Sequence, residues 1–585
     1  MTAAIRLPLV KTEPIQPLAM PDQSFRSPFT DPAATGIRLP RSVKALRLAV
    51  LTMPLCVTLA LAWIGLGWFT VDGHLAATEA ALVAVTVFAF YWVVLSVATA
   101  ALGLFWRPRP KVQALHGLSV AILLPMYGEP AAATIGNAAS LLAALSGKGR
   151  HRFSLHVLSD SRDTAAARDE LAWISAARLT HPGLALQYRR RTTNTDYKSG
   201  NIRDWVTSRG HDHDAMLILD ADSVMAAASV LLMADRMAVE PGLGLIQTVP
   251  RVLGGHTLWQ RMQSFASEVY GTNLGRGFAL WTGVEGNFLG HNALVRTRAF
   301  AASAGLPHLP GRAPRGGVIL SHDFVEAALI RRAGWGVRML PEASESYEDT
   351  PETLPGYLRR DRRWCQGNMQ HLRLLTVPGL HLVSRFHLLQ GAMAYLASVW
   401  WLALLALWAL SGPGNAFYDP FLANPLMPIW PDVPPVSQAA LSVTVGLMLL
   451  GPKLLGIAAH LRDRGLPLRQ LPGFGASVLV EVVLSVLLAP ALMVHQVRAV
   501  LRTLAGFDGG WMPHLTGRPG LGTLLRFHGT ESALGAALLC LCALGRVDLW
   551  LLPVAGSLCL TSFISWLVQR DVRSGWLLRP IGGSR

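Results

Sequence analysis

The sequence predicts an α/β domain of the Rossmann-like type, cytosolic and inserted into a polytopic α-helical membrane domain. The chain has 585 residues, of which 51% are hydrophobic and 15% are charged, whereas about 25% of residues are charged in soluble proteins. The apolar excess is concentrated near the N-terminus and in the last third, and the middle has an ordinary soluble composition. In that middle part short apolar runs alternate with helical patterns, which is typical of an α/β fold.

The N-terminal part predicts a polar tail followed by two transmembrane helices. Residues 1–40 are polar and rich in proline, with no apolar signal-peptide core, so we expect a disordered cytosolic tail. Residues 41–111 contain apolar stretches at about 45–69 and 78–105, each long enough to cross a hydrocarbon core of about 30 Å. Basic residues precede the first stretch and follow the second, which places these two ends in the cytosol. Residues 112–380 contain no spanning stretch and form the cytosolic domain.

The C-terminal region, residues 381–570, predicts further crossings, with an uncertain part at about 474–530. Segment 474–504 is apolar, is interrupted by Pro490 and lies between basic stretches. We therefore expect a short hairpin or a kinked re-entrant element there rather than one crossing. The other expected elements are spans at 386–410 and 439–460, a periplasmic loop at 412–436, a final hairpin within 531–568 and a cytosolic tail at 571–585. This charge pattern requires an even number of crossings, six or eight, with both termini cytosolic in a bacterial inner membrane.

The charge balance points to membrane lipids as partners. Lys and Arg number 52, against 36 Asp and Glu. Most of the excess flanks the apolar stretches, where positive-inside bias and anionic headgroups explain it, so we expect no nucleic-acid partner. Lys453 and Glu481 are ionisable residues within the apolar C-terminal region. They either line a polar path through the membrane or, for Lys453, reach the cytosolic interface.

The middle domain predicts a parallel sheet covered by helices on both faces. Five apolar runs are expected as strands, and helical patterns separate several of them. The strands are 120–124, 153–158, 184–188, 216–219 and 243–248, and the helices are 130–146, 164–179 and 226–239. Ligands bind such sheets outside the carboxyl ends of the strands.

Polar residues follow four of these strands where that rule predicts a site. They are Tyr127 and Glu129, then Asp160, then Lys198, then Asp220 and Asp222. An Asp-x-Asp at a strand end can hold Mg²⁺, or Mn²⁺, that bridges a diphosphate, and Lys198 adds a point charge. Acidic turns are common on their own, but four coordinated strand ends favour a functional site. The stretch 211–214, His-Asp-His-Asp, lies at the opposite edge and is interpreted as a solvated loop.

Two later segments complete the candidate site. Asp323 opens a helix that runs to about residue 333, where it is either a helix cap or a general base that accepts a hydroxyl proton. Arg363 and Trp364 lie on a helix that begins after Pro355. A guanidinium suits a leaving diphosphate and an indole suits stacking on a sugar. The alternatives are a basic helix at lipid headgroups and, for Trp364, a place in the core.

The order of these residues resembles the processive glycosyltransferases of family two, which have a GT-A fold. The spaced aspartates of that family fall on Asp160, on Asp220 and Asp222, and on Asp323, and its arginine-tryptophan motif falls on Arg363 and Trp364. Relatives usually carry Gln four residues before the Trp, where this chain has Arg360, which leaves the roles of Arg360 and Asp361 open. Segments 290–293, 321–326 and 360–368 resemble the subfamily that makes osmoregulated periplasmic glucans, and the resemblance covers most of the chain beyond about residue 40.

The resemblance implies an inverting transfer of glucose from UDP-glucose to a growing glucan with a β-1,2-linked backbone, coupled to export. It implies a divalent metal and, in some relatives, acyl carrier protein and periplasmic glucan-processing proteins as partners. The implied site roles are uridine binding by Tyr127, Glu129 and Asp160; ribose or phosphate binding by Lys198 and Asp220; metal binding by Asp222 with Asp220; and acceptor binding by His291, Asn292 and Trp364. A cellulose-like synthase or a lipid-linked sugar transferase is the alternative. An inactive transporter or scaffold is disfavoured by the complete acidic set.

Overall fold

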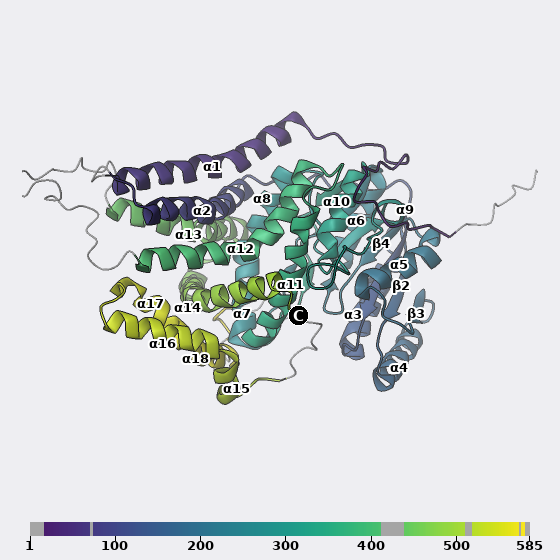
Figure 1. Cartoon of the computed structure of the whole chain (residues 1–585). Helices are drawn as coiled ribbons and strands as arrows, with labels where there is room; N and C mark the ends of the chain where they lie inside the picture. The colour runs from purple at the N-terminus through teal and green to yellow at the C-terminus, as the bar shows by residue number, and fades with distance from the viewer. Residues whose placement is uncertain (1–16, 71–73, 411–437, 509–516, 573–574, 579–585) are drawn as a thin grey trace, which may run out of the picture.

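The computed structural model describes residues 17–70, 74–410, 438–508, 517–572 and 575–578. Four long apolar helices lie side by side at one end of the molecule, and the α/β domain lies at the other (Figure 1). They are α1 (Arg41–Phe69), α2 (Ala77–Gly103), α12 (Leu382–Leu410) and α13 (Gln438–Arg464). The spans expected from sequence are therefore helices. The loop expected at 412–436 lies outside the described residues.

The α/β domain is built on a seven-stranded mixed sheet. Its order is β3 (Leu186–Arg190), β2 (Arg152–Ser159), β1 (Ser119–Met126), β4 (Ala215–Ile218), β8 (Ala293–Arg296), β6 (Leu243–Gln247) and β9 (Gly336–Met339). The five expected strands are confirmed. The expectation of an all-parallel sheet is wrong, because β8 runs antiparallel to both β4 and β6. Ala293 pairs with Gln247, so β8 begins at the edge where β6 ends and must run back.

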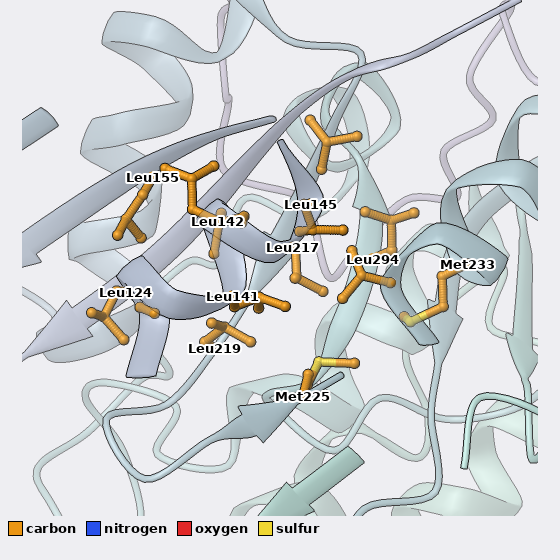
Figure 2. Close-up of a cluster of buried hydrophobic side chains, with 14 of the residues drawn as sticks. Leu124, Leu141, Leu142, Leu145, Leu155, Leu217, Leu219, Met225, Met233 and Leu294 are labelled. Carbon is orange, nitrogen blue, oxygen red and sulfur yellow. The ribbon is translucent and has the colours of Figure 1, made fainter. Parts of the chain in front are cut away.

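Helices cover both faces of this sheet, as predicted. On one face α3 (Ala131–Leu145) and α6 (Ala227–Val239) bury Leu142 and Met233 against Leu217 (Figure 2). On the other face the helices are α5 (Tyr197–Arg209), α9 (Thr297–Ser303) and α10 (His322–Arg332). The helix α4 (Thr164–Thr180), which connects β2 to β3, packs against α3. A second sheet of β5 (Val224–Met225), β10 (Ser346–Glu348) and β7 (Arg251–Val252) lies next to the carboxyl edge.

The segment 17–40 is packed on the α/β domain, so the expectation of a disordered tail is wrong for these residues. Trp335 Nε1 donates to Asp31 Oδ2 at 2.9 Å, and Arg332 donates to Gln23 Oε1 at 3.0 Å. Met20 is buried in the hydrophobic core beside α5 and α9. A few apolar residues and two buried polar ones suffice to dock this segment. Their spacing lacks the periodicity of a helix or strand, so the sequence did not reveal the packing. Residues 1–16 lie outside the described part.

The segment 474–504 belongs to one continuous helix, α14 (Leu471–Leu504), so the expected hairpin or re-entrant element is wrong. Pro490 lies within it, and a proline removes only one backbone hydrogen bond from a helix of 34 residues. By length and composition, five described helices including α14 can cross a membrane, and a pair bent by 53° at 549–568 would make six.

The helix α14 nevertheless packs on the α/β domain along its length. Phe474 contacts Phe265 of α7 (Leu258–Ala266), with ring centroids 5.8 Å apart. Near the other end, the His495 ring nitrogen Nε2 lies 3.0 Å from the Leu358 carbonyl of α11 (Leu354–His371). Both ends of α14 thus lie beside the same domain, which fits the basic stretches on both of its flanks. The even number of crossings stays a prediction.

Lys453 and Glu481 form an ion pair between α13 and α14. The Lys453 ammonium lies 2.6 Å from Glu481 Oε1, and the Tyr270 hydroxyl of η2 (Ser267–Gly271) donates to Glu481 Oε2 at 2.9 Å. The Lys453 side chain is therefore paired with Glu481, and a polar path lined by these two residues stays a prediction. The pair ties two apolar helices to the α/β domain.

The C-terminal residues return to the α/β domain. After α15 (Leu521–Phe527) and α16 (Gly529–Ala543), the chain forms α17 (Leu552–Cys559) and α18 (Thr561–Val568). The backbone of Asp571 then forms an isolated β-bridge with that of Thr257, and the Leu578 amide donates to Ser477 Oγ at 3.0 Å. The described part of the expected tail at 571–585 is therefore packed beside the α/β domain.

Candidate active site

The strand ends and the loop before β8 bring the candidate residues together. The Lys198 ammonium forms an ion pair with Asp220 at the end of β4 and donates to the Gly290 carbonyl at 2.7 Å. Gly290 has a φ of 88°, and a Cβ atom added there would lie 3.3 Å from Asp323 Oδ2. Glycine therefore permits a close approach that places Asp323 beside the Lys198 and Asp220 pair.

The two carboxylates of the Asp-x-Asp have different electrostatics. Burial opposes ionisation of Asp220, but the Lys198 ammonium and His291 hold its pKa below the usual range. Burial and repulsion from Asp220 raise the pKa of Asp222 to about 6. The Asp222 side chain nevertheless reaches solvent. A cation can therefore approach it and relieve the repulsion.

The residues fit a metal that completes its coordination with substrate. Among the described residues no group of three or more His, Cys, Asp or Glu side chains is arranged to hold a metal. Mg²⁺ is usually held by one or two carboxylates together with substrate phosphates. The pair Asp220 and Asp222 offers that donor set, with oxygen ligands only.

Asp323 occupies the first turn of α10, where Ser321 is the residue that precedes the helix. The alternative that Asp323 is merely the helix cap is therefore wrong. Burial raises the pKa of Asp323, although His322 acts in the opposite direction. The start of α10 also contacts α11, because the His371 ring lies 2.8 Å from the Ser321 carbonyl.

The helix α11 presents a guanidinium and an indole beside this site. The Arg360 guanidinium stacks over the Trp364 ring at 4.6 Å, as their spacing of four residues predicts. Trp364 is 40% exposed, so the alternative of a core tryptophan is wrong. Burial and repulsion from Arg360 lower the pKa of Arg363, whereas Asp220 raises it, so Arg363 lies within electrostatic reach of the Asp-x-Asp.

Asp361 anchors this helix from its buried side. The side chain is 4% exposed and accepts hydrogen bonds from the Tyr395 hydroxyl at 3.3 Å and the Gln496 amide at 3.2 Å. These donors belong to α12 and α14, so Asp361 holds α11 against two apolar helices. Sequence reasoning missed this role because both partners are distant in the chain.

Asp160 lies at the carboxyl end of β2, the strand beside β1, and forms a bidentate ion pair with Arg191. Arg191 Nε and Nη2 donate to its two oxygens at 2.6 and 2.8 Å. The Glu129 side chain accepts from the Tyr127 amide, and the Gly128 amide donates to Ser161 Oγ at 2.8 Å, which joins the ends of β1 and β2. Arg191 was missed from sequence, where it is one of three consecutive arginines at the end of a strand.

The structure corrects the expected acceptor contact of Asn292, whereas that of His291 stays a prediction. The His291 ring pairs with Glu348 at 3.1 Å. Burial opposes its protonation, but Glu348 and Asp220 raise its pKa to about 9. It therefore lies beside the Asp-x-Asp. Asn292 is fully buried and donates to Ser346 Oγ and the Tyr347 carbonyl, both at 3.0 Å, because β10 covers it. Its role is to position the loop before β8 rather than to contact an acceptor.

The stretch 211–214 lies at the amino edge of the sheet, away from these residues, as expected. It is not simply solvated, because His213 stacks on Trp205 with ring centroids 5.6 Å apart and the Asp214 carboxylate accepts from the Ser119 amide at 2.8 Å. Its histidine and aspartate side chains thus have structural partners.

The chain is similar to known glycosyltransferases. Residues 215–435 match the family described as glycosyl transferase family group 2. Among solved structures, mannosyltransferase PcManGT from Pyrobaculum calidifontis, in complex with GDP-Man and Mn²⁺, is 15% identical with a TM-score of 0.44, covering 73% of this chain and 99% of that chain.

Curated relatives match over more of the chain. Glucans biosynthesis glucosyltransferase H from Shewanella oneidensis is 41% identical over 457 residues, which cover 75% of this chain and 62% of that protein. The protein of the same name from Rhodopseudomonas palustris strain TIE-1 is 39% identical over 590 residues, which cover 96% of this chain and 80% of that protein. The chain is thus a glycosyltransferase that belongs to the glucans biosynthesis glucosyltransferase H family.

Proposed function

We propose that the chain transfers glucose from UDP-glucose to the end of a growing glucan and builds the β-1,2-linked backbone of osmoregulated periplasmic glucans. The observation that carries this proposal is the contact between Lys198, Asp220, Gly290 and Asp323. It puts an Asp-x-Asp and an ammonium, suited to a sugar diphosphate, beside a carboxylate suited to a base. The family of the chain supports a glucan as product.

Asp323 acts as the general base in a single, inverting displacement. It accepts the proton of the acceptor hydroxyl while that oxygen attacks the C1 atom of the donor sugar. The raised pKa of Asp323 brings its basicity closer to neutral pH, where a general base is most effective. Positioned bases contribute about 10²–10⁴ in rate.

The cationic side chains stabilise the departing UDP. Arg363 and Lys198 face the Asp-x-Asp and offer positive charge to the diphosphate. A Mg²⁺ or Mn²⁺ ion held by Asp222 and Asp220 would supply further positive charge to the same oxygens. Removal of one stabilising group of this kind costs about 10²–10³ in rate. The exposed Trp364 indole offers a flat face on which the terminal sugar of the acceptor stacks.

The remaining parts of the proposal concern the membrane. The chain lies in the bacterial inner membrane with the α/β domain and both termini in the cytosol, and the apolar helices carry the glucan outward. Acyl carrier protein and periplasmic glucan-processing proteins are its proposed partners. A cellulose-like synthase or a lipid-linked sugar transferase is the second candidate, since either reaction needs the same donor site.

The test uses membranes that contain the full chain. They are supplied with radiolabelled UDP-glucose and either Mg²⁺ or Mn²⁺, and the product is digested with linkage-specific glucanases. We expect a metal-dependent polymer that only a β-1,2-specific enzyme degrades. A β-1,4-linked product or a labelled lipid would support the second candidate, and no incorporation from UDP-glucose would refute the proposal.

A further inference from the structure

We propose that Arg191 is a positioning residue of the donor site. It holds Asp160 and the turn before Lys198 in one fixed arrangement. This inference rests on the proposed donor, a nucleoside diphosphate sugar. The family resemblance implies that Asp160 contacts the base of this nucleotide, and the proposed function assigns its phosphates to Lys198. No described hydrogen bond joins their side chains directly, so their spacing depends on what lies between them.

Arg191 makes hydrogen bonds to both parts at once. Its Nε and Nη2 atoms engage the two oxygens of Asp160 at 2.6 and 2.8 Å. The same guanidinium donates to the carbonyl of Thr195 at 3.1 Å and to the carbonyl of Tyr197 at 3.0 Å. Its remaining ion pair is with Asp204 at 3.0 Å. One planar group thus bridges the end of β2 and the turn that opens α5.

The turn needs such support because its backbone is strained. Asp196 and Tyr197 have φ values of 55° and 51°, and two successive left-handed residues without glycine are rare. The turn also lies close to the helix that follows, since a Cβ atom at Gly200 would lie 2.1 Å from the Thr195 carbonyl. Such conformations persist only where the surroundings determine them. Arg191 on one side and the His308 ring, 2.8 Å from Asp196, on the other provide that determination.

The requirement is for arginine rather than for a positive charge. Two donors in a rigid plane match the two oxygens of a carboxylate, and further donors of the same plane reach the turn. A lysine at this position can reach Asp160 or the turn but cannot bridge them in the same geometry. Charge and bridging can therefore be separated by substitution.

The test measures UDP binding by the purified full chain for Arg191→Gln and Arg191→Lys. The matched control is Arg178→Gln, which removes a hydrogen bond of 3.1 Å from α4 to the Leu186 carbonyl at the start of the same edge strand. We expect UDP affinity to fall about tenfold or more in both Arg191 variants, because Asp160 and the turn before Lys198 are then no longer held in one arrangement before UDP binds. The KM for UDP-glucose rises more than kcat falls, and the control stays at the wild-type value.

Each outcome decides one question. Wild-type UDP affinity in Arg191→Gln or in Arg191→Lys overturns the positioning role while the proposed function stands. Failure of the wild-type chain itself to bind UDP refutes the proposed function and, with it, this inference. If Arg191→Gln does not fold, Arg191→Lys decides, because it keeps the charge beside Asp160. An equal loss of affinity in Arg178→Gln would show a general effect of the edge strand and would also overturn the inference.

Discussion

Replacement of Asp323 by asparagine tests the chemistry of the site directly. Asparagine has nearly the same size, so α10 keeps its first turn and Gly290 keeps its close neighbour. The amide cannot accept the proton of an acceptor hydroxyl. A general base contributes about 10²–10⁴ in rate, which corresponds to about 2.7–5.4 kcal/mol of activation free energy. We expect glucose transfer by Asp323→Asn to fall by a factor in that range.

Donor binding in the same variant provides the internal control. Lys198 remains paired with Asp220 and bonded to the Gly290 carbonyl, so the groups that meet the diphosphate keep their places. We expect nearly unchanged UDP affinity, measured on the purified chain, beside initial rates of incorporation from radiolabelled UDP-glucose. Asp169→Asn, an exposed carboxylate on α4, serves as the matched control and should behave as wild type. Turnover of Asp323→Asn within about tenfold of wild type would contradict the assignment, since even a weak base contributes more.

Three further predictions follow from the same geometry. In the proposed mechanism the ionised form of Asp323 is the base. Because burial raises the pKa of Asp323, kcat should fall toward acid pH through a pKa above the ordinary aspartate value of about 3.9. A profile that is flat down to that value would contradict this. Trp364→Ala should lower acceptor-dependent transfer roughly 2- to 13-fold, for a stacking contact of about 0.5–1.5 kcal/mol, and Trp364→Phe should lower it less; equal rates in both variants would remove the stacking role. Asp361→Ala leaves the buried Tyr395 hydroxyl and the part-buried Gln496 amide without this acceptor and should cost about 2–4 kcal/mol, read as a lower unfolding temperature. Asp361→Asn keeps one acceptor oxygen and should cost less, and no difference between the two variants would refute the anchoring role.

Much of the fold was predictable because apolar runs and their ends are local features. Each expected strand agrees within about two residues with an observed one, since a buried run bounded by polar residues has few other placements. The antiparallel direction of β8 escaped prediction because it follows from where the preceding helices return the chain. Pro490 suggested a break in the apolar segment, yet packing against α7 and α11 keeps α14 continuous.

The site was predictable to the extent that it depends on strand ends. Parallel strands bring their carboxyl ends to one edge of the sheet, so the positions of the strand ends alone predicted that Asp160 and Asp220 lie near each other. Burial by other elements was not predictable in the same way. Asn292 is covered by β10, and Asp361 is hydrogen-bonded to side chains of α12 and α14. None of these three elements is close in sequence to the residue that it contacts. A resemblance of motifs transfers residue types, whereas exposure depends on contacts between distant segments.

One buried carboxylate connects the membrane helices to the helix that carries Asp323. Glu285 lies before β8 and forms ion pairs with Arg47 of α1 and with Arg331 in the last turn of α10. Burial opposes its ionisation, but a hydrogen bond from His381 and the two guanidinium groups hold the pKa of Glu285 at about 2. Because α10 carries Asp323 in its first turn, a displacement of α1 relative to the domain would act on Asp323 through a single rigid helix. The ion pairs of Glu285 thus connect the apolar helix α1 to the helix that carries the proposed base.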